Sequence, residues 1–245
     1  MKTQKLTLLA AVASVVAVFS FTSAQAAIIW GTPATNAGTS SDIYAPAGAT
    51  FFAGVTGCPT YANSGSYTDT TTGVVFKGDT SAAASGVFAD SHITINNGGY
   101  PWHTGGGGTG LSGVFGGVEW EATVNDNVAM TISGLTSGHN YAVQMFAGGT
   151  SSYSMVLDPT AQVPSGANLT LLGAHNVVGT FTASGSTQSI AIGGLTNNPG
   201  VAYAAMFWAA TQIQDITNVP EPQTWAMLLG GVGMLVGFRR MRRRH

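Results

Sequence analysis

The sequence predicts an all-β body, an antiparallel β-sandwich or jelly roll, flanked by two apolar terminal segments. The chain contains 34 glycines and only 7% charged residues. This composition disfavours helices, because glycine costs about 1 kcal/mol per helical site relative to alanine. Short runs of alternating apolar and polar residues recur along the chain, separated by glycine, serine, threonine and asparagine. Many short strands at this spacing are typical of two-sheet sandwiches and jelly rolls.

The first 26 residues have the three parts of a signal peptide. Lys2 and Lys5 form a basic start, and residues 6–21 are apolar. Ala24-Gln25-Ala26 then matches the small-residue pattern that signal peptidase cleaves. We predict that the mature chain begins at Ala27 and that the protein leaves the cytoplasm.

Residues 27–218 form the predicted body, which is one domain's worth of chain. The longest predicted strand, 201–216, is expected to be a central strand of the core or a strand with a bulge. Two hairpins are expected, with turns at 133–138 and 184–186. The other predicted strands cover 74–76, 92–95, 118–124, 128–132, 141–146, 180–183 and 188–192.

The first of these turns carries a local resemblance. Gly134-Leu135, Gly138 and Tyr141 have the spacing Gly-Leu-x-x-Gly-x-x-Tyr, which resembles a hairpin of jelly-roll modules in secreted bacterial proteins. We expect Leu135 to plug the end of the sandwich, Gly138 to take the turn and Tyr141 to start the return strand. Fibronectin-type and galactose-binding-like domains both use such corners, and the galactose-binding-like jelly roll is our first interpretation.

Residues 219–245 have three parts in a fixed order. Pro220, Glu221 and Pro222 interrupt helix and strand pairing, and the uncharged apolar segment 225–238 follows. The chain then ends in a basic cluster, which consists of Arg239, Arg240, Arg242, Arg243 and Arg244. A short transmembrane helix with arginines on its cytoplasmic side agrees with the positive-inside bias. The whole arrangement resembles the PEP-CTERM sorting signal of Gram-negative bacteria.

This resemblance implies a route for the protein. An exosortase in the inner membrane would recognise and process the tail, while the body reaches the cell surface or the exopolysaccharide matrix. The apolar segment spans only about 21–24 Å, against a hydrocarbon core of about 30 Å, so we expect a transient inner-membrane anchor. The same signal occurs in some ice-binding proteins, but this body lacks a regular Thr-x-Thr array.

The distribution of charge excludes nucleic acid as a partner. The chain has 8 Lys+Arg and 10 Asp+Glu, but between the two terminal segments the only basic residue is Lys77. A single lysine cannot neutralise a row of phosphates. The expected partners are therefore signal peptidase and exosortase for processing, with exopolysaccharide implied by the family resemblance.

The glycine-rich stretch 96–110 is the candidate ligand loop. Tyr100 and Trp102 could stack on a sugar ring, and Asn96, Asn97 and His103 could bind its hydroxyl groups. The alternative is a plain connection whose aromatic side chains pack on the sandwich.

No catalytic residues are predicted, and no cofactor is expected. The histidines show no zinc-site spacing. Glu119 and Glu121 share a strand face, but exposed strands carry such pairs routinely. Oxygen donors near turns leave a structural Ca²⁺ open, at Asp79, Asp90, Asn125, Asp126, Asn127 and Asp158. The sequence favours a non-enzymatic surface or matrix protein, with a carbohydrate-binding or adhesin module and a secreted glycan hydrolase as the alternatives.

Overall fold

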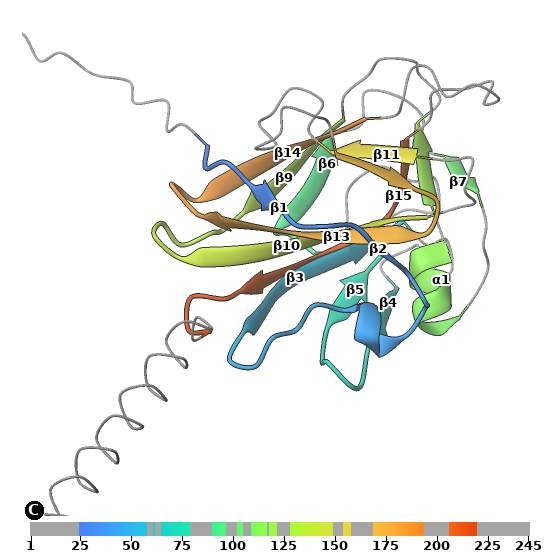
Figure 1. The fold of residues 1–245 in the computed structure, drawn as a ribbon, viewed down its shortest axis with the longest axis horizontal. Coiled ribbons are helices and arrows are strands. Elements are labelled where there is room, and N and C mark those ends of the chain that lie inside the picture. The colour runs from blue at the N-terminus through green and yellow to red at the C-terminus, as the bar shows by residue number, and fades with distance from the viewer. Residues whose placement is uncertain are drawn as a thin grey trace, which may run out of the picture.

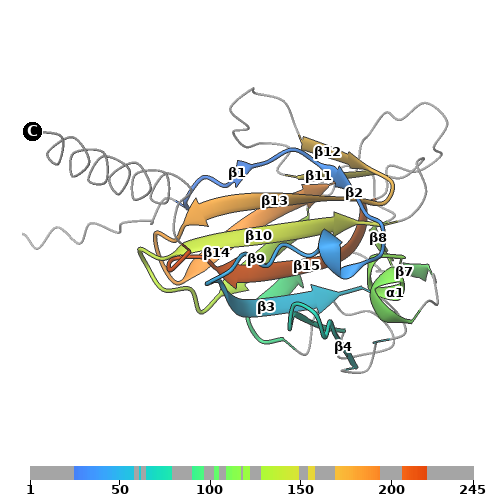
Figure 2. The same cartoon turned by 60° about the horizontal axis from the view of Figure 1, so that its bottom comes forward.

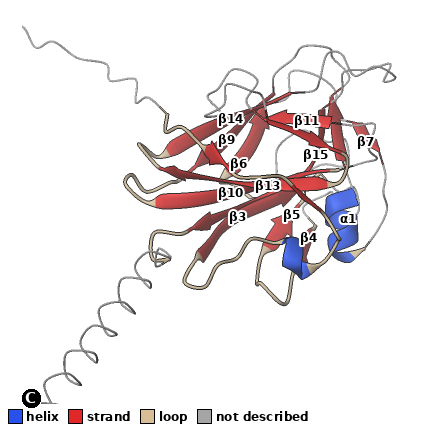
Figure 3. Ribbon diagram, in the orientation of Figure 1, coloured by secondary structure: helices blue, strands red, loops and turns tan. Residues whose placement is uncertain are grey.

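The computed structural model describes residues 25–57, 61, 65–78, 90–96, 102–104, 109–116, 118–121, 128–148, 154–157, 169–193 and 206–219. They form β-structure with little helix (Figure 3). The helical turns are η1 (Ser40–Asp42) and α1 (Gly110–Gly116). The strands are β1 (Ile29–Trp30), β2 (Ala34–Thr35), β3 (Thr50–Thr56), β4 (Ser66–Thr68), β5 (Val75–Lys77), β6 (Ile93–Asn96), β7 (Trp102–Thr104), β8 (Val118–Glu121), β9 (Val128–Ser133), β10 (Asn140–Ala147), β11 (Ser154–Leu157), β12 (Leu169–Leu172), β13 (His175–Thr182), β14 (Thr187–Gly193) and β15 (Met206–Asp215).

The strands are arranged in two layers (Figures 1 and 2). The first layer runs β13-β10-β15-β3-β5-β4, with β1 and β2 on the free edge of β13. The second runs β6-β9-β14-β11-β12. β15 belongs to the first layer, and Met206 at its start pairs with Ser154 of β11 in the second layer, which joins the two layers. Met206 also pairs with Glu121 of β8. Pairing is antiparallel throughout the described strands except at β11–β15 and β3–β5.

The main core lies between the two layers. Every strand from β9 to β15 contributes to it, together with β3 and β6. Its largest fully buried side chains include Trp208, Tyr141, Ile93, Met130 and Met155. A second core covers the outer face of the first layer beneath α1, where the Phe115 and Phe146 rings stack with centroids 4.2 Å apart. Its members are Ile43, Val74, Phe76, Leu111, Val114, Phe115, Phe146, Ala209 and Ala210.

The all-β prediction is confirmed, and so is the central position of the last strand. β15 lies between β10 and β3, and its register shifts opposite Phe146/Ala147 and again at Ile213/Gln214. Both expectations for this segment, a central strand and a bulge, are therefore met. Leu135 is buried at 5% exposure and Gly138 has a φ of 85°, as the corner motif predicted.

Both predicted hairpins are wrong. β9 pairs with β6 and β14, whereas β10 pairs with β13 and β15. β14 pairs with β9 and β11 instead of with β13. The turns at 133–138 and 184–186 are therefore corners that carry the chain from one layer to the other. Each strand turns its apolar face toward the main core, and a corner places the two strands on opposite sides of that core.

The structure contains a short helix that the sequence did not predict. The α1 helix was not expected, since its sequence Gly-Leu-Ser-Gly-Val-Phe-Gly contains three glycines. Burial of Leu111, Val114 and Phe115 stabilises it.

Within the described ranges, no helix has both the length and the apolar character needed to span a bilayer. The predicted apolar segment 225–238 lies outside these ranges, as do residues 1–24.

Candidate functional site

The last described residues are held firmly against the first layer. Ile216 N donates a 2.8 Å hydrogen bond to Asn140 O, and Asn140 N donates a 2.9 Å bond to Thr217 Oγ1. Val219 N then donates to Ile216 O at 3.0 Å, which closes a turn. The chain therefore leaves the body from a defined point directly after β15.

A hydrogen-bonded histidine–aspartate pair supports this exit point. His139 Nδ1 lies 2.8 Å from Asp215 Oδ2, and Thr217 N donates a 3.0 Å bond to Asp215 Oδ1. Burial raises the pKa of the Asp215 carboxyl, but the hydrogen bonds from Thr217 and His139 outweigh it, so that this pKa lies below its ordinary value. Asp215 is accordingly an anion that ties the end of β15 to the corner before β10.

The N-terminal segment reaches the same end of the body. Together, the two ends border a groove of about 610 Å³. Its lining combines apolar side chains with hydroxyl and amide groups, and Ile29, at its rim, is 63% exposed. The lining residues are Ala26, Ala27, Ile29, Tyr44, Asn140, Thr180, Phe181, Thr182, Ile216, Thr217 and Val219.

Next to this groove, a buried amide network attaches the segment around η1 to the outer face of the first layer. Gln144 uses both ends of its amide: Oε1 accepts from Tyr44 N at 2.8 Å and from Gln212 Nε2 at 2.7 Å. Nε2 donates to Asp42 O at 2.6 Å and to Asn176 Oδ1 at 2.8 Å. A smaller hollow of about 380 Å³ borders this network and shares Tyr44 with the groove.

This network was not predicted from the sequence, although its signal was present. Gln144, Gln212 and Gln214 interrupt two strongly apolar strands, and all are at most 3% exposed. Buried polar side chains are hydrogen-bonded as a rule. A glutamine on a strand expected at the centre of the core therefore indicates a partner that covers it.

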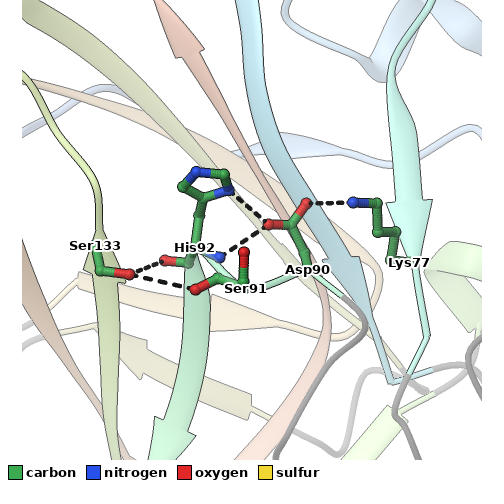
Figure 4. A network of polar contacts seen from close by, with 5 residues as sticks. All are labelled: Lys77, Asp90, Ser91, His92 and Ser133. Atoms are coloured by element: carbon green, nitrogen blue, oxygen red, sulfur yellow. Dashed lines mark hydrogen bonds and ion pairs between the residues drawn. The ribbon is translucent and has the colours of Figure 1, made fainter.

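A third polar cluster surrounds Asp90, whose side chain is 3% exposed (Figure 4). Lys77 Nζ lies 3.3 Å from Asp90 Oδ2, and His92 Nδ1 lies 3.0 Å from Oδ1. Ser133 Oγ does not turn to the histidine ring but donates to the Ser91 and His92 carbonyl oxygens at 3.4 and 3.3 Å. The cluster thus links β5 and β9 through the segment that directly precedes β6.

The predicted ligand loop is only partly described. Asn96 ends β6, while Trp102 and His103 lie in β7 opposite Trp120 and Glu119 of β8. β6 pairs with β9 in the second layer, so the described strands do not pair the two parts of the loop with each other. Asn97 and Tyr100 lie outside the described residues.

The remaining candidates fall on few described residues. Of the proposed calcium donors only Asp90 is described, and Lys77 and His92 occupy its carboxylate. In the part of the chain that the structure describes, no group of three metal-ligating side chains comes together. Pro220, Glu221, Pro222 and the arginine cluster lie outside it, and the domain boundaries at 26/27 and 218/219 stay predictions.

Comparisons with known proteins address the tail directly. No curated protein and no solved structure matches the chain significantly. Residues 218–244 match the family model described as the PEP-CTERM protein-sorting motif. This match begins at Asn218, within the turn that ends the described body. The motif implies an exported protein that an exosortase sorts, and the chain is consistent with a PEP-CTERM domain-containing protein.

Proposed function

We propose that this chain is a non-enzymatic protein of the cell surface or the exopolysaccharide matrix. A signal peptide exports it, signal peptidase removes residues 1–26, and the tail holds it briefly in the inner membrane until an exosortase processes it. One observation carries the proposal: the sorting motif occupies residues 218–244 and follows directly on β15. The bonds of Ile216 and Thr217 to Asn140 fix the body upstream of the tail. The tail can therefore be cut without loss of a described core strand.

Location and processing test this proposal in a bacterium that has an exosortase. The full-length chain is compared with a variant carrying Pro220→Ala, Glu221→Ala and Pro222→Ala, by mass spectrometry of membrane, surface and medium fractions. We expect the wild type to lose its tail and reach the surface, and the variant to stay in the inner membrane with an intact tail. Gln223→Ala with Thr224→Ala is the matched control, and it should behave like the wild type.

A second variant separates recognition from topology. Replacing the arginine cluster by glutamines removes the positive charge that holds the tail's end in the cytoplasm. Some chains should then pass fully across the membrane, whereas loss of the Pro-Glu-Pro motif should leave a correctly oriented, unprocessed anchor. Normal processing and delivery of both variants would show that the tail is only a membrane anchor.

The groove at the two chain ends favours a second candidate, a carbohydrate-binding or adhesin module. Tyr44 offers an aromatic side chain, and Asn140, Thr180, Thr182 and Thr217 offer amide and hydroxyl groups. A galactose-binding-like jelly roll would suit this role, and the two-layer all-β body supports it. The polysaccharide of the producing organism is the ligand to test, with Tyr44→Ala against Tyr67→Ala as the control.

This binding test also addresses the enzyme alternative. Binding that Tyr44→Ala abolishes and Tyr67→Ala preserves supports a groove for sugars. Binding that is lost only with Trp102→Ala points instead to the 96–110 loop. Release of reducing ends from the polysaccharide by the purified protein contradicts a non-enzymatic role.

A further inference from the structure

Gln188 has a buried oxygen that lacks a partner. Its side chain is 3% exposed, and Oε1 has no hydrogen-bond donor among the described residues. The other end of the amide is occupied, because Nε2 donates to Ala26 O at 3.1 Å and to Ser189 O at 3.2 Å. A buried acceptor without a donor is unfavourable, since its contact with water is lost and nothing replaces it.

The unpartnered oxygen lies beside the predicted cleavage site. Ala26 O is bonded to Gln188, and Gln25 Oε1 accepts a 3.2 Å bond from Ser189 N. The end of the leader thus touches β14 through two consecutive residues. These two contacts belong to the uncleaved chain, because both Gln25 and Ala26 precede the predicted start at Ala27.

The residues just after the cleavage site are held in place independently. Ile29 and Trp30 pair with Thr180 and Gly179 of β13. Ile28 and Trp30 pack against the main core and cover Gly179 so closely that a Cβ there would lie 2.5 Å from Ile28 Cγ2 and Trp30 Cε3. Residue 27 is therefore kept near Gln188 even after the leader has gone.

Cleavage changes the chemistry at this point. Hydrolysis of the Ala26–Ala27 bond consumes one water, removes the Ala26 carbonyl with the leader and leaves an ammonium group on Ala27. An ammonium carries three donors and no acceptor. In a peptide unit the oxygen and nitrogen are about 2.2 Å apart, so this donor appears close to the place that the Ala26 oxygen occupied. That place faces Gln188 Nε2, which is itself a donor, so the Gln188 amide has to turn to present Oε1 to the ammonium.

We propose that Gln188 is the binding site for the α-ammonium group of the mature chain, with Oε1 as the acceptor. The inference rests on the proposed signal-peptidase step. A bond between an ammonium and a carbonyl oxygen is charge-assisted and stronger than a neutral one. The bond supplies the missing donor to Gln188 and replaces the contact that β14 loses with the leader. It anchors the new N-terminus across the two layers, through β13 by backbone pairing and through β14 by Gln188.

Amine reactivity tests this site in the exported protein. Once the leader has been removed, the chain contains only two primary amines, the α-amino group of Ala27 and the ε-amino group of Lys77. The full-length gene is expressed with its own leader in a Gram-negative host. The purified product is exposed to limiting N-hydroxysuccinimidyl acetate, and mass spectrometry follows acetylation of each amine. A hydrogen-bonded ammonium must leave its acceptor to react, so Ala27 should react about tenfold more slowly in native protein than in urea.

Variants assign the protection to Gln188. Gln188→Met keeps the side chain's length but removes the acceptor, and Ala27 should then react about tenfold faster, with Lys77 unchanged. Gln188→Glu restores an acceptor and should restore protection. Gln214→Met is the matched control, because Gln214 is also 3% exposed but bonds to Gln212, and it should leave Ala27 protected.

The outcomes separate the two proposals. If the mature chain starts elsewhere than Ala27, both the cleavage site and this binding site are wrong. If it starts at Ala27 and that amine reacts equally fast in folded and unfolded wild type, only the binding site is wrong. The wild-type comparison decides the matter even if Gln188→Met fails to fold. Equal protection in wild type and folded Gln188→Met also overturns the inference.

Discussion

Leu135 N donates a 3.1 Å hydrogen bond to Ser186 O, and this bond joins the corner between β9 and β10 to the corner between β13 and β14. Gly138 N and Ala183 N extend the contact, with bonds to Ala183 O at 2.8 Å and His139 O at 2.9 Å. Each corner carries the chain from one layer to the other. Side by side, they close the end of the main core over the buried Leu135 side chain.

The two glycines of the first corner should respond differently to the same substitution. Gly134 and Gly138 have φ values of 80° and 85°, so alanine at either costs about 1–2 kcal/mol in backbone strain. At Gly138 nothing lies within 4 Å of the added Cβ, but at Gly134 the His92 ring lies 2.9 Å away. We expect Gly134→Ala to lower the free energy of unfolding by about 1 kcal/mol more than Gly138→Ala, measured in urea. Equal losses would contradict this account of the corner.

His139→Ala should shift the titration of Asp215. The histidine bond is one of those that lower the pKa of this carboxyl, so its removal should move that pKa upward, as seen by carbon NMR of the carboxyl group. The side chains are 41% and 23% exposed, so the loss of stability should stay below about 1 kcal/mol. Thr217→Val removes a different donor and should also raise this pKa. No shift in either variant would refute the assigned role of these bonds.

Asp69 should make the protein sensitive to acid. Its 2% exposed carboxylate accepts bonds from Ser40 Oγ at 2.6 Å, Thr72 N at 2.8 Å and Thr72 Oγ1 at 2.6 Å. Burial raises the pKa of this carboxyl, but these bonds together lower it below its ordinary value. Its contribution to stability is therefore complete above the ordinary pKa of 3.8 and is lost as pH falls through the lowered value.

The test uses Asp69→Asn in urea unfolding at neutral and acidic pH. We expect a loss of about 1–3 kcal/mol at neutral pH, and a difference from the wild type that shrinks as the pH falls below 3.8, where the wild-type carboxylate begins to be protonated. Thr72→Val keeps the carboxylate and should give an intermediate loss. A difference that is constant with pH would contradict the ionised state of Asp69.

Gln144→Leu should release the segment around η1. The substitution leaves Tyr44 N, Asp42 O and the Gln212 and Asn176 side chains each short of a partner, at a cost of about 3 kcal/mol or more. Hydrogen exchange of the Tyr44 backbone amide should be faster in this variant than in the wild type, because the amide loses its acceptor. Gln214→Leu loses the bond from Gln214 to Gln212 and should cost about 1 kcal/mol. Similar effects of both substitutions would show that the network does not hold the segment.

Short stretches of sequence were enough to predict the features that depend on local chemistry. The Pro-Glu-Pro break, the apolar stretch and the arginine cluster are contiguous, and the sorting motif they predicted is matched at residues 218–244. Alternating residues likewise placed β5, β6, β8, β9, β10 and β14 within a few positions, whereas the strands β1–β4, β7, β11 and β12 were not predicted. Glycine marked the corners at Gly134 and Gly138. In each case the residues that determine the feature lie within a few positions of it in the sequence.

Which strands pair was decided by the tertiary structure. A turn between two strands looks the same in sequence whether it closes a hairpin or crosses the core, and at 133–138 and 184–186 only the burial of both apolar faces selects the crossing. The amide network joins Gln144 to Tyr44, 100 residues away, and the groove gathers Ala27 and Val219 from opposite ends of the chain. Such contacts are absent from any local pattern, because the free energy that favours them comes from surfaces that meet only once the two layers have packed.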